Sequence, residues 1–157
     1  KEKPRPYFQQ NFLQFPLPSP TLRTIGTKYV VVIDQKESKE YDGIIDGSKP
    51  IFSRDSKRAV FAAKKGNKYV AVIDGKESDE YDSIRDNEIK FINRSKYVVF
   101  VGTKEVSEED RVESKSYLVV NNREIMSFKN LSTIVKTGKG FKFLAHIGSK
   151  LYLVTCK

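Results

Sequence analysis

Apolar and polar positions along this chain fall into short extended runs separated by turn residues. Residues 28–33 read KYVVVI and residues 68–73 read KYVAVI, with apolar side chains at successive positions. Neighbouring side chains of a strand point to opposite faces, so such runs are typical of strands covered on both sides. Between residues 25 and 157 no apolar pattern follows the 3.6-residue period of a helix. The pattern therefore predicts an all-β chain.

The strand pattern recurs at a fixed spacing. Residues 28–44 and 68–84 are identical at 13 of 17 positions, with an offset of 40. A third and weaker copy follows at residues 116–131, with an offset of 47 from the second. One such unit cannot bury its apolar faces alone, so neighbouring units must stack on one another. The spacing predicts a repeat array of small sheets.

The predicted hairpin turns carry residues that accept left-handed backbone angles. Asp34, Asp74 and Asn121 occupy equivalent positions after the apolar strands, and Asp and Asn tolerate such angles well. Calcium binding would instead need several oxygens clustered in one loop, and no Asp-x-Asp-x-Asp loop occurs. A charged strand follows the first two turns, at 37–42 and 77–82, and its charges suit the exposed edge of a sheet.

The turn between the next two strands gives the chain a resemblance to a known repeat family. Residues 52–57 read FSRDSK. This resembles the Phe-Ser-Pro-Asp-Gly-Lys turn of the tryptophan–aspartate-like (TolB-type) β-propeller repeats of bacterial secreted proteins, with Arg54 where Pro is usual. The resemblance implies a β-propeller-like array of four-stranded antiparallel blades and favours an extracytoplasmic location. Such repeats serve many functions, so it implies no particular activity.

The length of the chain allows about three to four blades of roughly 40 residues each. Residues 1–24 form a basic, Pro-rich segment ahead of the repeat domain at 25–157, and a strand within 7–15 could close the ring. The alternatives are a piece of a larger propeller, or an incomplete one that closes by oligomerising. The chain begins with Lys1 rather than Met, as we expect of a processed product or a fragment. No apolar run approaches the roughly 20 residues that cross a bilayer.

The net charge of +9 is concentrated towards the two ends of the chain. Residues 1–24 carry four basic and one acidic side chain, and residues 106–157 carry nine basic and five acidic ones. Five C-terminal lysines are candidates for binding a polyanion, either nucleic acid or acidic polysaccharide: Lys129, Lys136, Lys139, Lys142 and Lys150. Lysine is also a common protector of sheet edges, however, and nucleic-acid readers normally add stacking aromatic residues.

The third copy is preceded by an acidic insertion at residues 103–115. As the longest departure from the repeat, it is expected to be a loop, and it is either a solvated, mobile segment or a recognition element. Its acids Glu108, Glu109 and Asp110 are candidates for binding a partner.

Tyr-Asp pairs recur at Tyr41-Asp42 and Tyr81-Asp82. Their carboxylates could form a ring that binds a cation or a basic partner. A structural role is the alternative, with the Tyr packed between units and the Asp capping a turn. The third copy has Phe128 followed by Lys129, which keeps the aromatic side chain and reverses the charge. A packing role survives that change and a metal ring does not, so the sequence favours the structural role.

The sequence offers few candidates for a catalytic nucleophile or base, with one histidine and one cysteine. His146 has no acid within four residues, Cys156 stands beside the C-terminus, and neither has the neighbours of a catalytic nucleophile or base. We therefore expect no enzyme activity and no cofactor. The leading hypothesis is a non-enzymatic module that binds or scaffolds another protein, a peptide or another ligand. The alternatives are polyanion binding through the basic ends, and the propeller portion of a larger enzyme such as a peptidase.

Overall fold

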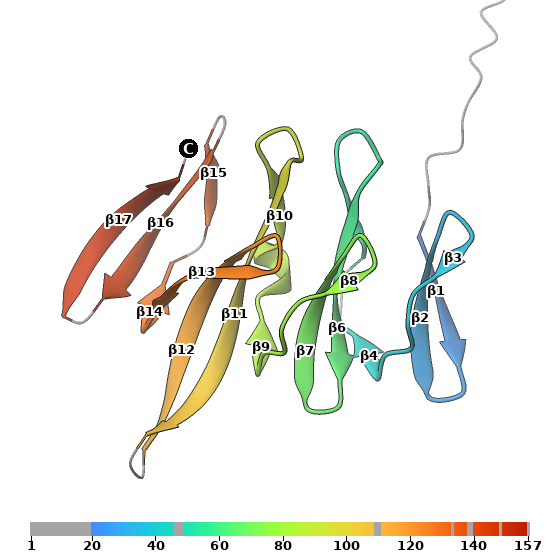
Figure 1. Ribbon diagram of the computed structural model, residues 1–157, viewed down its shortest axis with the longest axis horizontal. Helices are drawn as coiled ribbons and strands as arrows, with labels where there is room; N and C mark the ends of the chain where they lie inside the picture. Colours follow the sequence, from blue (N-terminus) through green and yellow to red (C-terminus); the bar gives the residue numbers. More distant parts are fainter. Residues whose placement is uncertain are drawn as a thin grey trace, which may run out of the picture.

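A computed structural model describes residues 20–45, 49–108, 111–132, 134–137, 140–147 and 149–156. Within these residues the chain folds entirely from β-strands and one short 3-10 turn. The strands form four antiparallel sheets of three to five strands, which stand side by side in chain order (Figure 1). The all-β prediction is confirmed. The segment at 7–15, expected to add a closing strand, lies outside the described residues.

The first two sheets contain the first two copies of the sequence pattern. The first sheet has the order β1-β2-β3, with β1 (Thr21–Ile25), β2 (Lys28–Ile33) and β3 (Lys36–Glu37). The second sheet comprises β4 (Gly43–Ile44), β5 (Ile51–Phe52), β6 (Ala59–Lys65), β7 (Lys68–Ile73) and β8 (Lys76–Glu77). The short strands β4 and β5 share one edge of β6, and β7 and β8 follow on its other side.

The third and fourth sheets repeat this arrangement with longer central strands. The third sheet comprises β9 (Ser83–Ile84), β10 (Lys90–Ile92), β11 (Tyr97–Glu108), β12 (Arg111–Val120) and β13 (Arg123–Phe128), with η1 (Asp86–Glu88) between β9 and β10. The fourth sheet comprises β14 (Asn130–Leu131), β15 (Val135–Thr137), β16 (Gly140–Ile147) and β17 (Lys150–Cys156).

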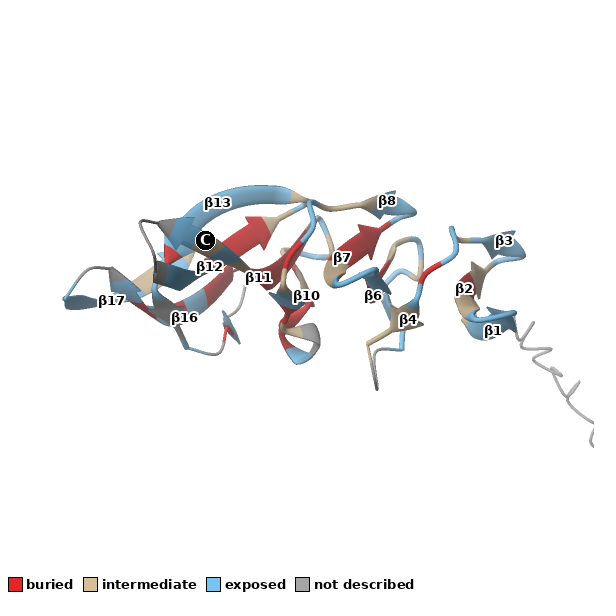
Figure 2. Ribbon diagram, turned by 90° about the horizontal axis from the view of Figure 1, so that it is seen from below, coloured by how far each residue is buried: buried red, intermediate tan, exposed pale blue. Residues whose placement is uncertain are grey.

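The core lies between successive sheets, because the central strands send alternate side chains to opposite neighbours. In β6, Phe61 packs towards the first sheet, whereas Ala62 packs towards the third. In β11, Phe100 packs towards the second sheet, whereas Val101 packs towards the fourth. Figure 2 shows the result, with buried residues in the central strands and exposed residues along β1 and β17 at the two ends. The continuous apolar runs of the sequence are explained by this double burial.

The prediction of a continuous charged strand at 37–42 and at 77–82 is wrong, because the strands β3 and β8 end at Glu37 and Glu77. Strand β3 ends at Glu37 because the Oγ of Ser38 accepts the N–H of Val31, at 2.9 Å, in place of a ladder hydrogen bond. In the second sheet the Oγ of Ser78 likewise accepts the N–H of Ala71, at 3.0 Å. Pairing resumes only at Tyr41 and Tyr81, each of which bridges the start of the neighbouring strand. The serines thus divide each outer strand in two.

The insertion at 103–115 is not a loop over its described residues. Strands β11 and β12 continue through it in register, from the Thr103–Ser116 pair to the Glu108–Arg111 pair. The β-branched side chains of Thr103, Val106 and Val112 favour this extended pairing. The insertion is therefore a hairpin that extends past the rest of the third sheet (Figure 1).

Candidate functional site

The first Tyr-Asp pair links the first sheet to the second. Asp42 accepts hydrogen bonds from the backbone N–H of Gly66, at 2.7 Å, and from Lys28 Nζ, at 2.5 Å, and these bonds lower the pKa of its carboxyl group. The Tyr41 hydroxyl donates to Glu77 Oε1 at 3.2 Å, and burial beside this carboxylate raises the pKa of Tyr41. Both side chains are engaged in holding two sheets together.

The second pair makes the same contacts between the second and third sheets. Asp82 accepts from Lys68 Nζ, at 2.5 Å, and from the backbone N–H of Glu105, at 2.9 Å, which lowers the pKa of its carboxyl group. The Tyr81 hydroxyl donates to Glu124 Oε1 at 3.0 Å, and burial together with this carboxylate raises the pKa of Tyr81. These contacts support the structural role for the Tyr-Asp pairs.

The third copy keeps only the aromatic contact. Phe128 packs edge-on against Phe143 of the fourth sheet, with ring centroids 5.4 Å apart. Lys129 is exposed and borders a hollow of about 210 Å³ with Glu113 and His146.

The hairpin residues adopt the backbone angles that their positions require. Asp34, Asp74 and Asn121 have φ angles of 49°, 51° and 48°. The carboxylate of Asp74 accepts the N–H of Ala59 at 3.0 Å, and the side chain of Asn121 accepts the N–H of Val98 at 2.9 Å. The side chains of Asp74 and Asn121 thus tie their turns to the adjoining strands β6 and β11.

The described candidate lysines beyond Lys129 lie on three different strands of the fourth sheet. Lys136 lies on β15 beside a groove described below, Lys142 lies on β16 opposite Val135, and Lys150 begins β17. Lys139, Glu109 and Asp110 lie outside the described residues, and of Glu108 only the backbone is described.

A basic groove of about 880 Å³ runs across three successive sheets along their short strands. Arg54 reaches it from the second sheet, Lys90 and Arg94 from the third, and Lys136 from the fourth. Among the described residues that line it, the only acid is Asp55, whose carboxylate accepts the Ser53 hydroxyl at 2.6 Å and the backbone N–H of Lys57 at 3.3 Å. These two bonds lower the pKa of Asp55, so the single negative charge is held within its own turn.

Three of the four cations in this groove are available to a ligand. The side chains of Arg54, Arg94 and Lys136 make no hydrogen bond or ion pair with the described part of the chain and are exposed. Lys90 instead donates to the carbonyl oxygen of Ile134 at 2.5 Å, which ties the third sheet to the fourth. The phenylalanine residues of the groove add an apolar surface to this positive lining.

Arg94 stands in an unusual turn. Asn93, Arg94 and Ser95 all have left-handed backbone angles, with φ of 47°, 53° and 69°. This turn is one residue shorter than its counterpart at 52–57. Successive non-glycine residues in this region are costly and persist where the surroundings hold them. The hydroxyl of Ser95 accepts the backbone N–H of Arg54 at 3.2 Å, which joins the two turns that line the groove.

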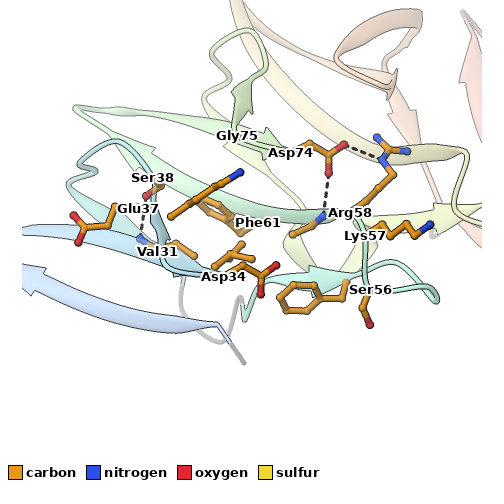
Figure 3. A pocket seen from close by; sticks show the side chains of 14 residues that line it. Val31, Asp34, Glu37, Ser38, Ser56, Lys57, Arg58, Phe61, Asp74 and Gly75 are labelled. Carbon is orange, nitrogen blue, oxygen red and sulfur yellow. Dashed lines mark hydrogen bonds and ion pairs between the residues drawn. The ribbon is translucent and has the colours of Figure 1, made fainter. Parts of the chain in front are cut away.

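An apolar pocket of about 310 Å³ lies between the first and second sheets (Figure 3). Val31 and Ile33 line it from β2, and Phe61 lines it from β6. Its rim is polar and includes Asp34 and Arg58. A pocket of this size, apolar inside and polar at the rim, suits one or two apolar side chains of a ligand.

The pocket and the groove adjoin, because Phe52 lines both. Arg58 fixes the turn that separates them: its Nε lies 2.8 Å from Asp74 Oδ2, an ion pair visible in Figure 3. Its Nη1 donates to the carbonyl oxygens of Ser95 and Lys96, each at 2.9 Å. One arginine thereby holds two sheets in fixed relation beside both hollows.

Among the described residues no group of three or more His, Cys, Asp or Glu side chains could hold a metal ion. His146 borders the small hollow beside Lys129, and burial raises the pKa of the Cys156 thiol, which disfavours its reactive thiolate. No helix in the described ranges is long and apolar enough to span a membrane.

No protein-family model, curated protein or solved structure matches this chain. The candidate site therefore rests on its own geometry. Sequence reasoning selected Lys136 but missed Arg54, Lys90, Arg94 and Phe52. The FSRDSK turn at residues 52–57 was a signal for two of them, Phe52 and Arg54, because it combines an aromatic and a basic side chain in one turn.

Proposed function

We propose that this chain is a non-catalytic binding module for an acidic segment of a partner protein. The acidic residues of the partner lie in the basic groove and one of its apolar side chains enters the adjoining pocket. Arginine pairs well with carboxylates because its planar fork donates two parallel hydrogen bonds. The observation that carries the proposal is the convergence on one groove of three cations from three successive sheets, none of which has a side-chain partner among the described residues.

The apolar pocket favours a protein segment over a simple polyanion. A polyanion needs charge and, for nucleic acids, stacking surfaces. The pocket between the first two sheets has aliphatic and aromatic side chains in its lining, among polar and charged ones, and it meets the groove at Phe52. A peptide that carries both carboxylates and an apolar side chain uses the two hollows together.

We also propose that the four sheets are blades of a β-propeller-type array. Each sheet packs face to face on the next, and the short strands of the last three sheets lie on a common edge, where the groove is found. Propellers commonly bind ligands with loops on such a rigid scaffold.

The test is fluorescence anisotropy with a labelled glutamate-rich peptide that contains one leucine. We expect binding that weakens as salt rises, because exposed charge pairs are screened. The charge-reversal variant R54E/R94E should weaken binding by roughly tenfold or more. The matched control K129E/K150E removes the same charge from other surfaces and should bind nearly as the wild type does.

Two outcomes would contradict the proposal. Equal binding by R54E/R94E and the wild type would exclude the groove as the site. Loss of heparin or DNA retention in K129E/K150E, with R54E/R94E unaffected, would instead support polyanion binding through the chain ends.

A further inference from the structure

The outer face of the fourth sheet is exposed and carries four large apolar side chains, with Lys142 and His146 beside them on β16. Val135, Leu144, Leu151 and Leu153 are 58%, 42%, 60% and 65% exposed. Leu144 and Leu153 are direct cross-strand partners on β16 and β17, and Leu151 lies two residues along the same face of β17. All four side chains point away from the third sheet, because their neighbours Phe141, Phe143 and Ala145 are the residues that pack towards it.

The same positions are covered in the inner sheets. The pair equivalent to Leu144 and Leu153 is Ala62 and Ala71 in the second sheet, and Val101 and Leu118 in the third, by their register against the buried phenylalanine of each central strand. Those four residues are at most 1% exposed, because the next sheet lies on them. The fourth sheet thus presents a stacking face with no sheet of the described residues on it.

The opposite end of the array differs in character. On the outer face of the first sheet, Arg23 and Glu37 form an ion pair at 2.7 Å across β2. Thr21 stands where the inner sheets carry the buried phenylalanine. Packing the leucines of the fourth sheet on this face would desolvate an ion pair, which is costly. The two ends are therefore poor partners for each other.

We propose that the outer face of the fourth sheet binds the same face of a second copy of this chain, about a two-fold axis. The contact is self-complementary, since Leu144 and Leu153 meet their counterparts at its centre. Such a contact closes after two copies and does not propagate, because the other end of the array is polar.

The size of the face sets the strength of the dimer. Three strands about 4.8 Å apart and seven residues of about 3.3 Å each cover roughly 14 by 23 Å. Two such corrugated faces bury on the order of 1,000 Å², at the lower limit of specific interfaces. We therefore expect a monomer–dimer equilibrium in the micromolar range. The dimer carries two basic grooves, but this inference does not depend on the proposed function.

Sedimentation equilibrium of the full chain over a range of concentrations tests the proposal. We expect a concentration-dependent dimer, and the variants L144K and L153K should each weaken it by roughly tenfold or more. The control I125K adds the same charge at a strand residue of the third sheet that is 55% exposed, and should dimerise as the wild type does. Far-UV circular dichroism and thermal melting verify that the variants are folded.

The proposal is overturned in either of two cases. In the first, the wild-type chain remains a monomer up to about a hundred micromolar. In the second, a dimer persists undiminished in L153K, which would place the interface elsewhere.

Discussion

Successive sheets of this array meet at three junctions, two built around a tyrosine and the third around a phenylalanine. The three junctions share an aromatic contact but differ in their hydrogen bonds. Tyr41 and Tyr81 pack edge-on against Phe61 and Phe100 of the next sheet, with centroids 6.0 and 5.9 Å apart. Phe128 packs on the fourth sheet in the same way. The aromatic contact is thus present at all three junctions, and the tyrosine–glutamate hydrogen bond is present at two.

The tyrosine–glutamate bond depends on an outer strand in the next sheet that carries the glutamate. Each tyrosine hydroxyl donates to a glutamate on the outer strand of the next sheet, Glu77 on β8 and Glu124 on β13. In the fourth sheet β17 is followed by no further strand of the described residues, so no equivalent glutamate faces Phe128. A phenylalanine suits that place because it brings no hydroxyl group that needs a buried partner. Aromatic packing is therefore the constant element of the junctions, and the tyrosine–glutamate bond is an addition.

Removing the aromatic rings should have the largest effect. We expect Y81A and F128A each to lower the free energy of unfolding by about 3–5 kcal/mol, because both leave a cavity between sheets. Urea unfolding followed by circular dichroism measures this. Nearly equal losses would support the constant aromatic element, whereas a much smaller loss for F128A would show that the two kinds of junction differ in their packing as well.

Filling the space beneath the tyrosine should have the next largest effect. A β-carbon at Gly102 would overlap the ring of Tyr81, whereas Ala145 stands at the equivalent position under Phe128. We expect G102A to destabilise the chain by about 1–3 kcal/mol, since Tyr81 must shift from its packed position. Recovery of part of this loss in the double variant G102A/Y81F would show that the tyrosine is free to move once its hydroxyl bond is gone.

Exchanging the two aromatic types isolates the hydroxyl group. Y81F loses one hydrogen bond, and we expect a cost of about 1 kcal/mol. F128Y places a hydroxyl at a buried position with no glutamate opposite, and we expect a cost of about 1–3 kcal/mol. Thermal unfolding of both variants measures the difference. A stabilised F128Y would mean that an acceptor lies near Phe128.

The smallest effect should appear in the pH dependence. Hydrogen bonds from Lys68 and the Glu105 N–H lower the pKa of Asp82 below its ordinary value of 3.8 in the folded state. The stability that Asp82 contributes is therefore present above about pH 4 and is lost as pH falls through the folded pKa. We expect D82N to be less stable at neutral pH and to lose less stability on acidification than the wild type. A parallel decline in both chains would exclude this contribution.

The fold could be predicted further than the site. Residues 28–33 and 68–73 carry apolar side chains on both faces and recur at a spacing of 40 residues. This pattern predicted stacked small sheets, because a strand that is buried on both sides needs apolar residues at successive positions. The break at Ser38 could not be predicted, since a serine hydroxyl replaces a backbone partner only in a particular geometry. The groove was missed because Arg54, Arg94 and Lys136 lie far apart in the sequence and meet only when three sheets align.

The most direct test of the central claim is a map of backbone amide shifts in the nuclear magnetic resonance spectrum during titration with the acidic peptide. If the groove holds the ligand, the largest shifts will fall at residues 51–55, 89–95 and 135–137. Shifts concentrated around Lys129, Lys142 and Lys150, with these three segments unchanged, would contradict the account.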